Sequence, residues 1–344
     1  MSRPEIRVAL LGCAHIPHAR SYARALSRSG TGRLVAVYDS SSEARLQLSA
    51  EFNVPAVAEP QLLFDDYAAQ AVIVCGATAE HRTMVELAAA NRAHVLSEKP
   101  LACNVADGRA MVQACRRAGV QLHTAFVCRF YPIVLEARKL IQAGELGELR
   151  GIVGANRGTP PLAPRYPAWI TDPGQAGGGA LIDHCVHVVD AMRFLSGANV
   201  TRVAAEVGTL FTELEVDDSA LISVVFDNGM VGSIDPSWSV RPGNPWSYDF
   251  FLRILGTEGS MSIVTGAESL KVAARIDGRD YSEVSFEPDI DAAMIENFLD
   301  SVQGGRLLDP SATGEDGICA LQVASAAYKS FRINNFVPIS GVDE

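Results

Sequence analysis

Short apolar runs and longer helical patterns alternate regularly over residues 1–128. The runs are rich in β-branched residues and apolar throughout, which is typical of strands covered on both faces. Strands that alternate with helices form a parallel sheet. The sequence therefore predicts a doubly wound α/β domain with strands at 7–11, 34–38, 71–75, 93–97 and 120–124 and helices at 17–28, 42–52, 80–91 and 105–118.

The pattern changes after Arg129, so we expect a second domain over residues 129–344. Its prolines and glycines at 158–179 predict an ordered loop at most. Later runs read as consecutive strands with turn signals such as Asp227-Asn228-Gly229 between them, which indicates an α+β domain with a largely antiparallel open sheet. The expected strands are 149–156, 203–210, 220–226, 231–236, 250–255, 260–264 and 270–274, with helices at 132–143, 180–195, 291–303 and 313–332.

The balance of charge and the cysteines exclude several classes of partner. Asp and Glu number 40 against 29 Lys and Arg, so the formal net charge is −11 and no long basic run exists to attract nucleic acid or an anionic membrane. No apolar run reaches the twenty or so residues of a membrane span. The seven cysteines are an odd number without a C-x-x-C pair, which favours free thiols in a reducing compartment. We expect a cytoplasmic protein.

A candidate nucleotide turn follows the first strand. Gly12 stands where a dinucleotide fold needs its first glycine, but Ala14 and Pro17 replace the second and third. Taken alone, this turn is therefore explained equally well as a phosphate-binding turn or as a strand-turn-helix without a ligand. Asp39 closes the second strand 27 residues later, where a carboxylate can bind the adenosine ribose and repel a 2′-phosphate. This favours NAD over NADP, although Asp39 could instead cap the next helix and the serines at 40–42 could tolerate a phosphate.

Two further patterns carry chemistry. The first is Glu98-Lys99-Pro100, at the carboxyl end of a predicted buried strand, where parallel sheets bind ligands. The second is the helix after three glycines at 177–179, on which Asp183, His187 and Asp190 share one face at spacings i, i+4 and i+7. Two carboxylates and an imidazole on one face are hard to explain as core packing, although Asp190 could only support the helix. His184 lies about 100 degrees around that helix and is either structural or a substrate contact.

Together these residues resemble the Gfo/Idh/MocA oxidoreductases, the family of glucose-fructose oxidoreductase and inositol dehydrogenase, over nearly the whole chain. Departures from the family pattern are Ala14, Pro17 and Cys185. The resemblance implies an N-terminal Rossmann domain and an NAD(P)-dependent enzyme that oxidises a secondary hydroxyl of a sugar, anhydrosugar or cyclitol, or reduces the matching ketone. It implies that the catalytic residues are Lys99, Asp183 and His187. We expect the cofactor to lie against Gly12, Ala14, His15, Ile16, Asp39, Ser40, Ala77, His81, Glu98 and Lys99.

The expected roles follow from the chemistry of hydride transfer, which requires a base for the hydroxyl proton. We assign the base to His187, with Asp183 orienting its ring and Lys99 stabilising the developing alkoxide. Lys99 as the base, with His187 as a positioning group, is the close alternative. A metal site is not expected, because no second cluster of ligands completes one around Asp183, His184 and His187.

Substrate contacts are expected from arginines and aromatic residues near the glycine-rich helix and in the strand connection at 233–246, because these side chains suit a polyhydroxylated ring. For the tryptophans, burial between sheet and loop is an equal alternative. The family resemblance also implies that the second sheet pairs face to face in a homodimer or homotetramer. The candidate contacts are Arg129, Arg157, Arg165, Tyr166, Trp169, His184, Trp238, Arg241 and Trp246.

Two other functions remain open on the same residues. One is an NAD-dependent glycoside hydrolase or lyase, which would oxidise a glycoside transiently, eliminate the leaving group and return the hydride. The other is a non-catalytic NAD(P)-binding regulator. The presence of Lys99, Asp183 and His187 together argues against the regulator, and no basic DNA-binding helix is evident.

Overall fold

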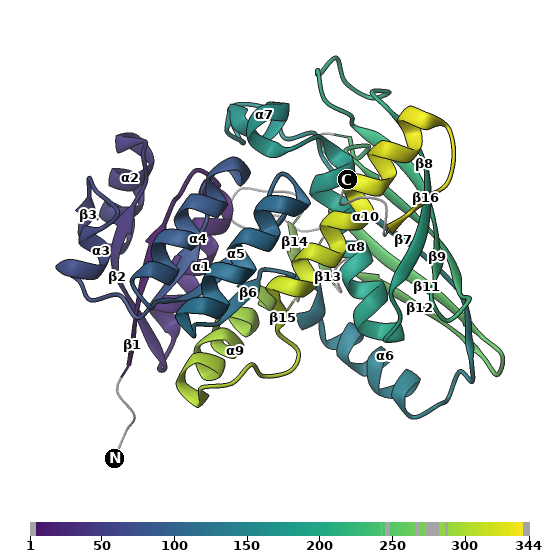
Figure 1. Cartoon of the computed structure of the whole chain (residues 1–344), viewed down its shortest axis with the longest axis horizontal. Helices are drawn as coiled ribbons and strands as arrows, with labels where there is room; N and C mark the ends of the chain where they lie inside the picture. The colour runs from purple at the N-terminus through teal and green to yellow at the C-terminus, as the bar shows by residue number, and fades with distance from the viewer. Residues whose placement is uncertain are drawn as a thin grey trace.

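The first sheet of the protein is parallel except at one edge. The computed structural model describes residues 5–241, 243–244, 248–265, 269–272, 282–285 and 288–339. The sheet order is β15-β6-β5-β4-β1-β2-β3 (Figure 1), and only β15 runs antiparallel to its neighbour. The strands are β1 (Ile6–Leu11), β2 (Gly32–Tyr38), β3 (Ala56–Val57), β4 (Ala71–Val74), β5 (His94–Ser97), β6 (Leu122–Thr124) and β15 (Ala312–Thr313).

Helices cover both faces of this sheet, as the apolar strands require. In β1, Val8 and Leu10 pack in one core, while Ala9 and Leu11 pack in the other. One face is covered by α1 (Ile16–Arg28) and α9 (Ile290–Gly304), and the other by α4 (His81–Ala90) and α5 (Val105–Ala118). The order of the chain reverses between β1 and β4, so ligands are expected beside the start of α1. The doubly wound domain is confirmed.

The second sheet is antiparallel except for one pair of strands. Its order is β12-β11-β7-β10-β9-β8-β16, and β7 and β10 run parallel. The largely antiparallel sheet is thus confirmed. The strands are β7 (Leu149–Gly158), β8 (Val200–Gly208), β9 (Ser219–Phe226), β10 (Val231–Ser237), β11 (Tyr248–Gly256), β12 (Ser260–Thr265) and β16 (Val337–Pro338), and a separate pair joins β13 (Ser269–Val272) to β14 (Ser282–Ser285).

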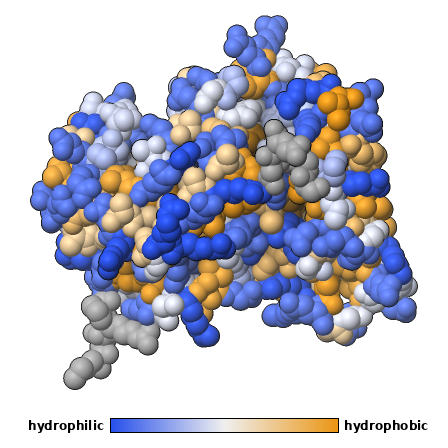
Figure 2. Space-filling model, viewed as in Figure 1, coloured by the Kyte–Doolittle hydropathy of each residue, from blue (hydrophilic) through white to orange (hydrophobic). Residues whose placement is uncertain are grey.

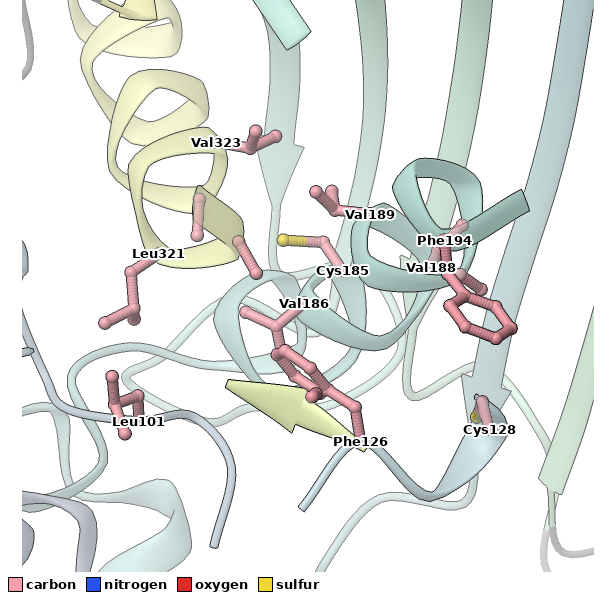
Figure 3. Close-up of a cluster of buried hydrophobic side chains, with 14 of the residues drawn as sticks. Leu101, Phe126, Cys128, Cys185, Val186, Val188, Val189, Phe194, Leu321 and Val323 are labelled. Carbon is pink, nitrogen blue, oxygen red and sulfur yellow. The ribbon is translucent and has the colours of Figure 1, made fainter. Parts of the chain in front are cut away.

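Two helices lie between this sheet and the first domain. They are α8 (Ala180–Ser196), which is buried on nearly every side, and α10 (Gly314–Ile333), drawn in yellow in the middle of Figure 1. Figure 3 shows Cys185 and Val189 of α8 on the side that faces Leu321 and Val323 of α10. A Cβ on Gly154 of β7 would meet the side chains of Val188 and Met192, so this glycine lets α8 lie close against the sheet.

The C-terminal part of the chain returns to the first sheet. Met294, Ile295, Phe298 and Leu299 of α9 pack in the same core as β1. The two residues of β15 pair with β6 at the sheet edge. α10 then leads back to the second sheet (Figure 1).

Some short elements differ from the prediction or add to it. The loop expected at 158–179 contains two short helical turns, η3 (Ala168–Thr171) and α7 (Pro173–Ala176), because Asp172 caps the second turn and proline fits its first position. The other additions are β3, β15, β16, β14, α3 (Leu62–Asp65), η1 (Thr78–Glu80) and η2 (Val127–Phe130), while α2 (Ser42–Phe52) and α6 (Pro132–Gln142) match expected helices. The viewed surface mixes polar and apolar residues (Figure 2). No helix in the described part of the chain is long and apolar enough to cross a membrane.

Candidate active site

A cavity of about 300 Å³ lies between the carboxyl edge of the first sheet and the N-terminal half of α8. One wall comes from the turns after β1, β4, β5 and β6, where doubly wound sheets bind ligands. The other wall comes from β7, the segment 159–179 and α8. Lys99, Asp183, His184 and His187 all line this cavity, so the structure brings the predicted catalytic residues of the two domains together.

Lys99 is held at the end of β5. Its backbone N–H donates to Glu98 Oε2 at 2.9 Å, and its ammonium Nζ donates to Asp183 Oδ1 at 2.6 Å. Burial by itself would lower the pKa of Lys99, but the carboxylates of Asp183 and Glu98 raise it above its usual value. Lys99 is therefore a charged hydrogen-bond donor at neutral pH.

Glu98 is buried among groups that keep it ionised. Its Oε1 lies 2.9 Å from His18 Nδ1 and also accepts a hydrogen bond from the Tyr22 hydroxyl. Burial opposes ionisation, but the charges of His18 and Lys99 hold the pKa of Glu98 well below its usual range. Both His18 and Tyr22 come from α1, so the Glu98-Lys99 turn is fastened to the helix that begins at the nucleotide turn.

Asp183, on α8, lines the cavity. Besides Lys99, it accepts from Trp238 Nε1 at 3.2 Å, and His184 Nε2 lies 3.3 Å from its Oδ2. Burial would raise the pKa of Asp183, but Lys99 and His184 hold it well below the usual range. The expectation that Asp183 orients the His187 ring is wrong for this arrangement, because the carboxylate turns to Lys99 instead.

His187 is buried and neutral. Its Nδ1 lies 3.9 Å from Cys128 Sγ, and that sulfur lies 3.5 Å from the hydroxyl of Tyr248. Burial, followed by the charge of Lys99, lowers the pKa of His187 well below its usual value. Burial raises the pKa of the Cys128 thiol to about 12, so this thiol remains protonated. His187 can therefore accept a proton, while Cys128 faces its other ring nitrogen.

The nucleotide turn fits a dinucleotide. Gly12 has φ +90°, and a Cβ there would lie 2.6 Å from the backbone nitrogen of Gly76, so the turn requires glycine. Asp39 is buried at the end of β2 and accepts the backbone N–H groups of Cys13 and Ser41. A carboxylate has lone pairs for about four hydrogen bonds, so Asp39 can also accept from ribose hydroxyls.

His15 and its neighbours provide further contacts at the start of α1. Burial and the adjacent His18 lower the pKa of His15 to about 3, and its Nδ1 has no hydrogen-bond partner within the described ranges. The Ala14 carbonyl accepts from Trp169 Nε1 at 3.1 Å. The segment 159–179 therefore touches the nucleotide turn directly. Ile16 begins α1, Ser40 is exposed after β2, and Ala77 precedes η1.

His81 does not line the cavity. It is buried, with Nδ1 near the carbonyls of Pro100 (3.1 Å) and Leu101 (3.2 Å) and Nε2 near the carbonyl of Gly76 (3.3 Å). Its place between these carbonyls ties the turn after β4 to the turn after β5. His81 therefore holds these two turns in place, and its contact with the cofactor stays a prediction.

Arg129 was predicted to contact substrate, and the structure corrects this. Arg129 is 5% exposed, and its guanidinium forms a two-point ion pair with Asp190, at 2.8 and 2.6 Å. It also lies 3.1 Å from Asp316 of α10. The charged pair lies away from the cavity lining, so Asp190 supports α8 by holding Arg129.

The other predicted substrate residues divide into two groups. Tyr166, Trp169, His184 and Trp238 line the cavity, whereas Arg165, exposed beside the Tyr166 ring, does not. Arg157 pairs with Asp249 at 2.7 Å on the second sheet, Arg241 is exposed, and Trp246 lies outside the described residues.

Several lining residues carried no sequence pattern. His18 and Tyr22 follow the nucleotide turn, and Asn156 ends a predicted strand. Tyr248 begins β11, two residues before the start of the predicted strand 250–255. The helical spacing of His15, His18 and Tyr22 could have indicated one face of α1 turned to the site. Within the described ranges, no group of three or more His, Cys, Asp or Glu side chains is arranged to hold a metal ion.

Comparison with known proteins gives the same two-part division. Residues 6–126 match the oxidoreductase family with an NAD-binding Rossmann fold, and residues 134–262 match the GFO/IDH/MocA C-terminal domain. The chain is 28% identical to the scyllo-inositol 2-dehydrogenase (NAD(+)) of Bacillus subtilis, over 97% of this chain and 96% of that protein.

Two other similarities extend over nearly the full length. The chain is 28% identical to the 1,5-anhydro-D-fructose reductase of Ensifer adhaerens, covering 94% of this chain and 96% of that protein. The crystal structure of a probable dehydrogenase from Thermotoga maritima superposes with a TM-score of 0.83 at 25% identity, covering 98% and 100% of the two chains. The chain therefore belongs to the Gfo/Idh/MocA family of oxidoreductases and carries that family's NAD-binding Rossmann domain.

Proposed function

We propose that this protein is an NAD-dependent dehydrogenase that oxidises a secondary ring hydroxyl of a sugar, anhydrosugar or cyclitol, or reduces the matching ketone. The observation that carries the proposal is the ion pair between Lys99 and Asp183 beside a neutral His187 in the cavity. The names of the relatives from Bacillus subtilis and Ensifer adhaerens, an inositol dehydrogenase and an anhydrosugar reductase, support this substrate class.

The charged ammonium of Lys99 is the group that hydrogen-bonds the reacting oxygen. A donor placed where negative charge develops stabilises the alkoxide and lowers the barrier. Asp183 positions Lys99 through the 2.6 Å contact and keeps it charged. When bound, NAD accepts the hydride.

The neutral ring of His187 is the acceptor for the hydroxyl proton. Since Nδ1 faces Cys128, Nε2 is the nitrogen available to the substrate. Burial and the nearby positive charge of Lys99 lower the pKa of His187 and disfavour the protonated ring, so a proton accepted there is readily passed on. Lys99 is a poor base in this arrangement, because its raised pKa keeps it protonated.

The cofactor would be held by residues at the carboxyl edge of the first sheet. Gly12 permits the close turn, the start of α1 offers backbone N–H groups to the phosphates, and Asp39 accepts from the ribose. The unpartnered Nδ1 of His15 is a further polar atom turned to this region.

We further propose a homodimer or homotetramer joined through the outer face of the second sheet. That face carries apolar side chains exposed on five neighbouring strands, which is unusual for a monomer. Their exposed fractions are 42% for Val153, 59% for Leu221, 55% for Val231, 54% for Leu255 and 60% for Val264.

A substrate screen tests the function. The enzyme is incubated with NAD or NADP and with pyranoses, anhydrosugars, inositols or aryl glycosides, while absorbance at 340 nm and released aglycone are followed together. We expect stoichiometric NADH with a free sugar or cyclitol. Aglycone release without net NADH would instead identify the redox-neutral hydrolase or lyase reaction. Cofactor binding without turnover of any compound would indicate a regulator.

A further inference from the structure

The side chain of Asn156 is a buried polar group without a partner. Asn156 is fully buried near the end of β7, yet it lines the active-site cavity. Neither its Nδ2 nor its Oδ1 has a hydrogen-bond partner among the described residues. Most buried amides are satisfied, since an unmade hydrogen bond is costly. An amide with both ends unsatisfied at a cavity wall therefore indicates a ligand contact.

The neighbours of Asn156 explain why its amide stays unpaired. Phe250 of β11 and Pro236 of β10 stand opposite it in the sheet, and neither side chain can hydrogen-bond. Its backbone carbonyl is engaged with His184 Nδ1 at 3.0 Å. The other ring nitrogen of His184 lies beside Asp183, which pairs with Lys99. The backbone of Asn156 is therefore linked through His184 to the pair of charged residues.

We propose that the amide of Asn156 determines substrate specificity by binding two neighbouring hydroxyls of the substrate ring, so that a vicinal diol is the recognised feature. The proposal rests on the proposed function and deepens it. Lys99 and His187 contact the hydroxyl that reacts, whereas Asn156 binds neighbouring hydroxyls that do not react.

The chemistry of the amide matches a diol. A primary amide has an acceptor oxygen and a donor nitrogen side by side, and a hydroxyl can both donate and accept. One hydroxyl can therefore donate to Oδ1 while its neighbour accepts from Nδ2. Because the amide is uncharged and the Lys99 and Asp183 charges balance, the wall favours neutral polyhydroxylated rings over anionic ones.

The first test measures stability without any ligand. Asn156→Leu replaces the amide with an apolar side chain of similar shape. We expect the Tm to stay constant or rise by about 1–4 °C, because a buried unsatisfied group has been removed. Asn199→Leu is the control for loss of a paired amide, since this exposed side chain already pairs with Arg193 and Asp227, and its Tm should fall. A clear fall in the Tm of Asn156→Leu would overturn the proposal, because it would show that water or protein satisfies the amide.

The second test measures binding to enzyme loaded with NADH. Cyclohexanol, cis-1,2-cyclohexanediol and trans-1,2-cyclohexanediol are titrated while the fluorescence of bound NADH is followed. The wild-type protein should prefer at least one diol over cyclohexanol by about 10-fold or more, and Asn156→Leu should lose that preference. Equal preference in both proteins would overturn the proposal. A weaker NADH affinity in the variant would also overturn it, because the amide would then serve the cofactor.

The third test uses the best substrate from the screen above. Asn156→Leu should lower kcat/KM by about 10–100-fold, mainly through KM, because the lost contacts form equally in ground and transition states. Asn199→Leu should leave both constants unchanged. If no sugar or cyclitol is oxidised, the proposed function fails, and the stability and diol measurements alone decide the role of Asn156.

Discussion

The pair formed by Lys99 and Asp183 links pH to activity. Replacing Asp183 by Asn removes the nearest anion, so burial would lower the pKa of Lys99. Lys99 would then lose its proton, and with it the charge that stabilises the alkoxide, at a lower pH than in the wild-type protein. We expect the high-pH limb of the kcat profile to move to lower pH in Asp183→Asn. An unmoved limb would contradict the assignment of Lys99 as the charged donor.

We expect Lys99 and His187 to determine the rate of the chemical step and to have little effect on the affinity for NAD. Lys99→Ala and His187→Ala are each expected to lower kcat by about 10²–10⁴-fold, the usual contribution of a positioned acid, base or charge donor. The Kd for NAD, measured by protein fluorescence, should change little. Wild-type turnover in either variant would refute the corresponding role.

Cys128 offers a matched comparison for His187. Its sulfur faces Nδ1 of His187 and the Tyr248 hydroxyl. Cys128→Ala should lower kcat less than His187→Ala, while Cys128→Ser, which keeps a hydrogen-bonding group, should recover most of the loss. The same substitution at Cys185, buried on the α10 side of the helix, serves as the packing control. Equal losses in Cys128→Ala and Cys185→Ala would show that only packing matters.

The preference for NAD is tested at the end of β2. Asp39→Ala should weaken NAD binding by about 10-fold and NADP binding less, because a ribose acceptor and a repulsive charge are both removed. Arg45 is a useful counterpart, since its guanidinium lies 3.1 Å from the Asp39 carbonyl. Arg45→Ala should weaken NADP more than NAD. An unchanged ratio of the two affinities in Asp39→Ala would remove the basis for choosing NAD.

Spacing along the sequence can identify side chains that share one face of a helix. Asp183 and His187 are four residues apart on a helix, so the sequence predicts that both side chains lie on the same face. The partner of Arg129 could not be found this way, because Asp190 is 61 residues away and only the packed fold joins them. Asn156 was missed for a related reason, since an isolated amide at the end of a strand has no pattern until its surroundings are known.

Among the elements, α8 depends on one buried ion pair. Arg129→Met leaves Asp190 buried without its counter-charge, which typically costs about 3–5 kcal/mol of stability. Urea unfolding should show this loss. Arg116→Ala is the control, because Arg116 pairs with Glu315 at an exposed site and such pairs contribute only about 0–1 kcal/mol. Similar losses in both variants would contradict the special role of the buried pair.

Long elements with clear periodicity were predictable, and very short ones were not. Strands β1, β2, β4, β5 and β6 were found because buried parallel strands are apolar throughout. In contrast, β3, β15 and β16 have two residues each and no period to detect. The turns η3 and α7 were hidden in a segment whose prolines and glycines usually mark loops.

For the whole molecule, the outer face of the second sheet should govern assembly. Light scattering should give a mass that is a multiple of the 36.7 kDa chain. Leu221→Asp would place a charge in the apolar face and should reduce the mass toward that of one chain. Leu46→Asp, at a similarly exposed leucine of α2, should leave the mass unchanged. A single-chain mass for the wild-type protein would contradict the proposed assembly.

The return of α9 and β15 to the first sheet also bears on synthesis at the ribosome. A nascent chain that ends near residue 128 already contains all the parallel strands of the first sheet, but Val8, Leu10 and Ile73 still lack the side chains of Met294, Phe298 and Leu299. The nucleotide-binding layer thus stays incomplete until almost the entire polypeptide has emerged. Cotranslational folding of this half in isolation is correspondingly disfavoured, and an expressed fragment would need residues 288–313 supplied to it.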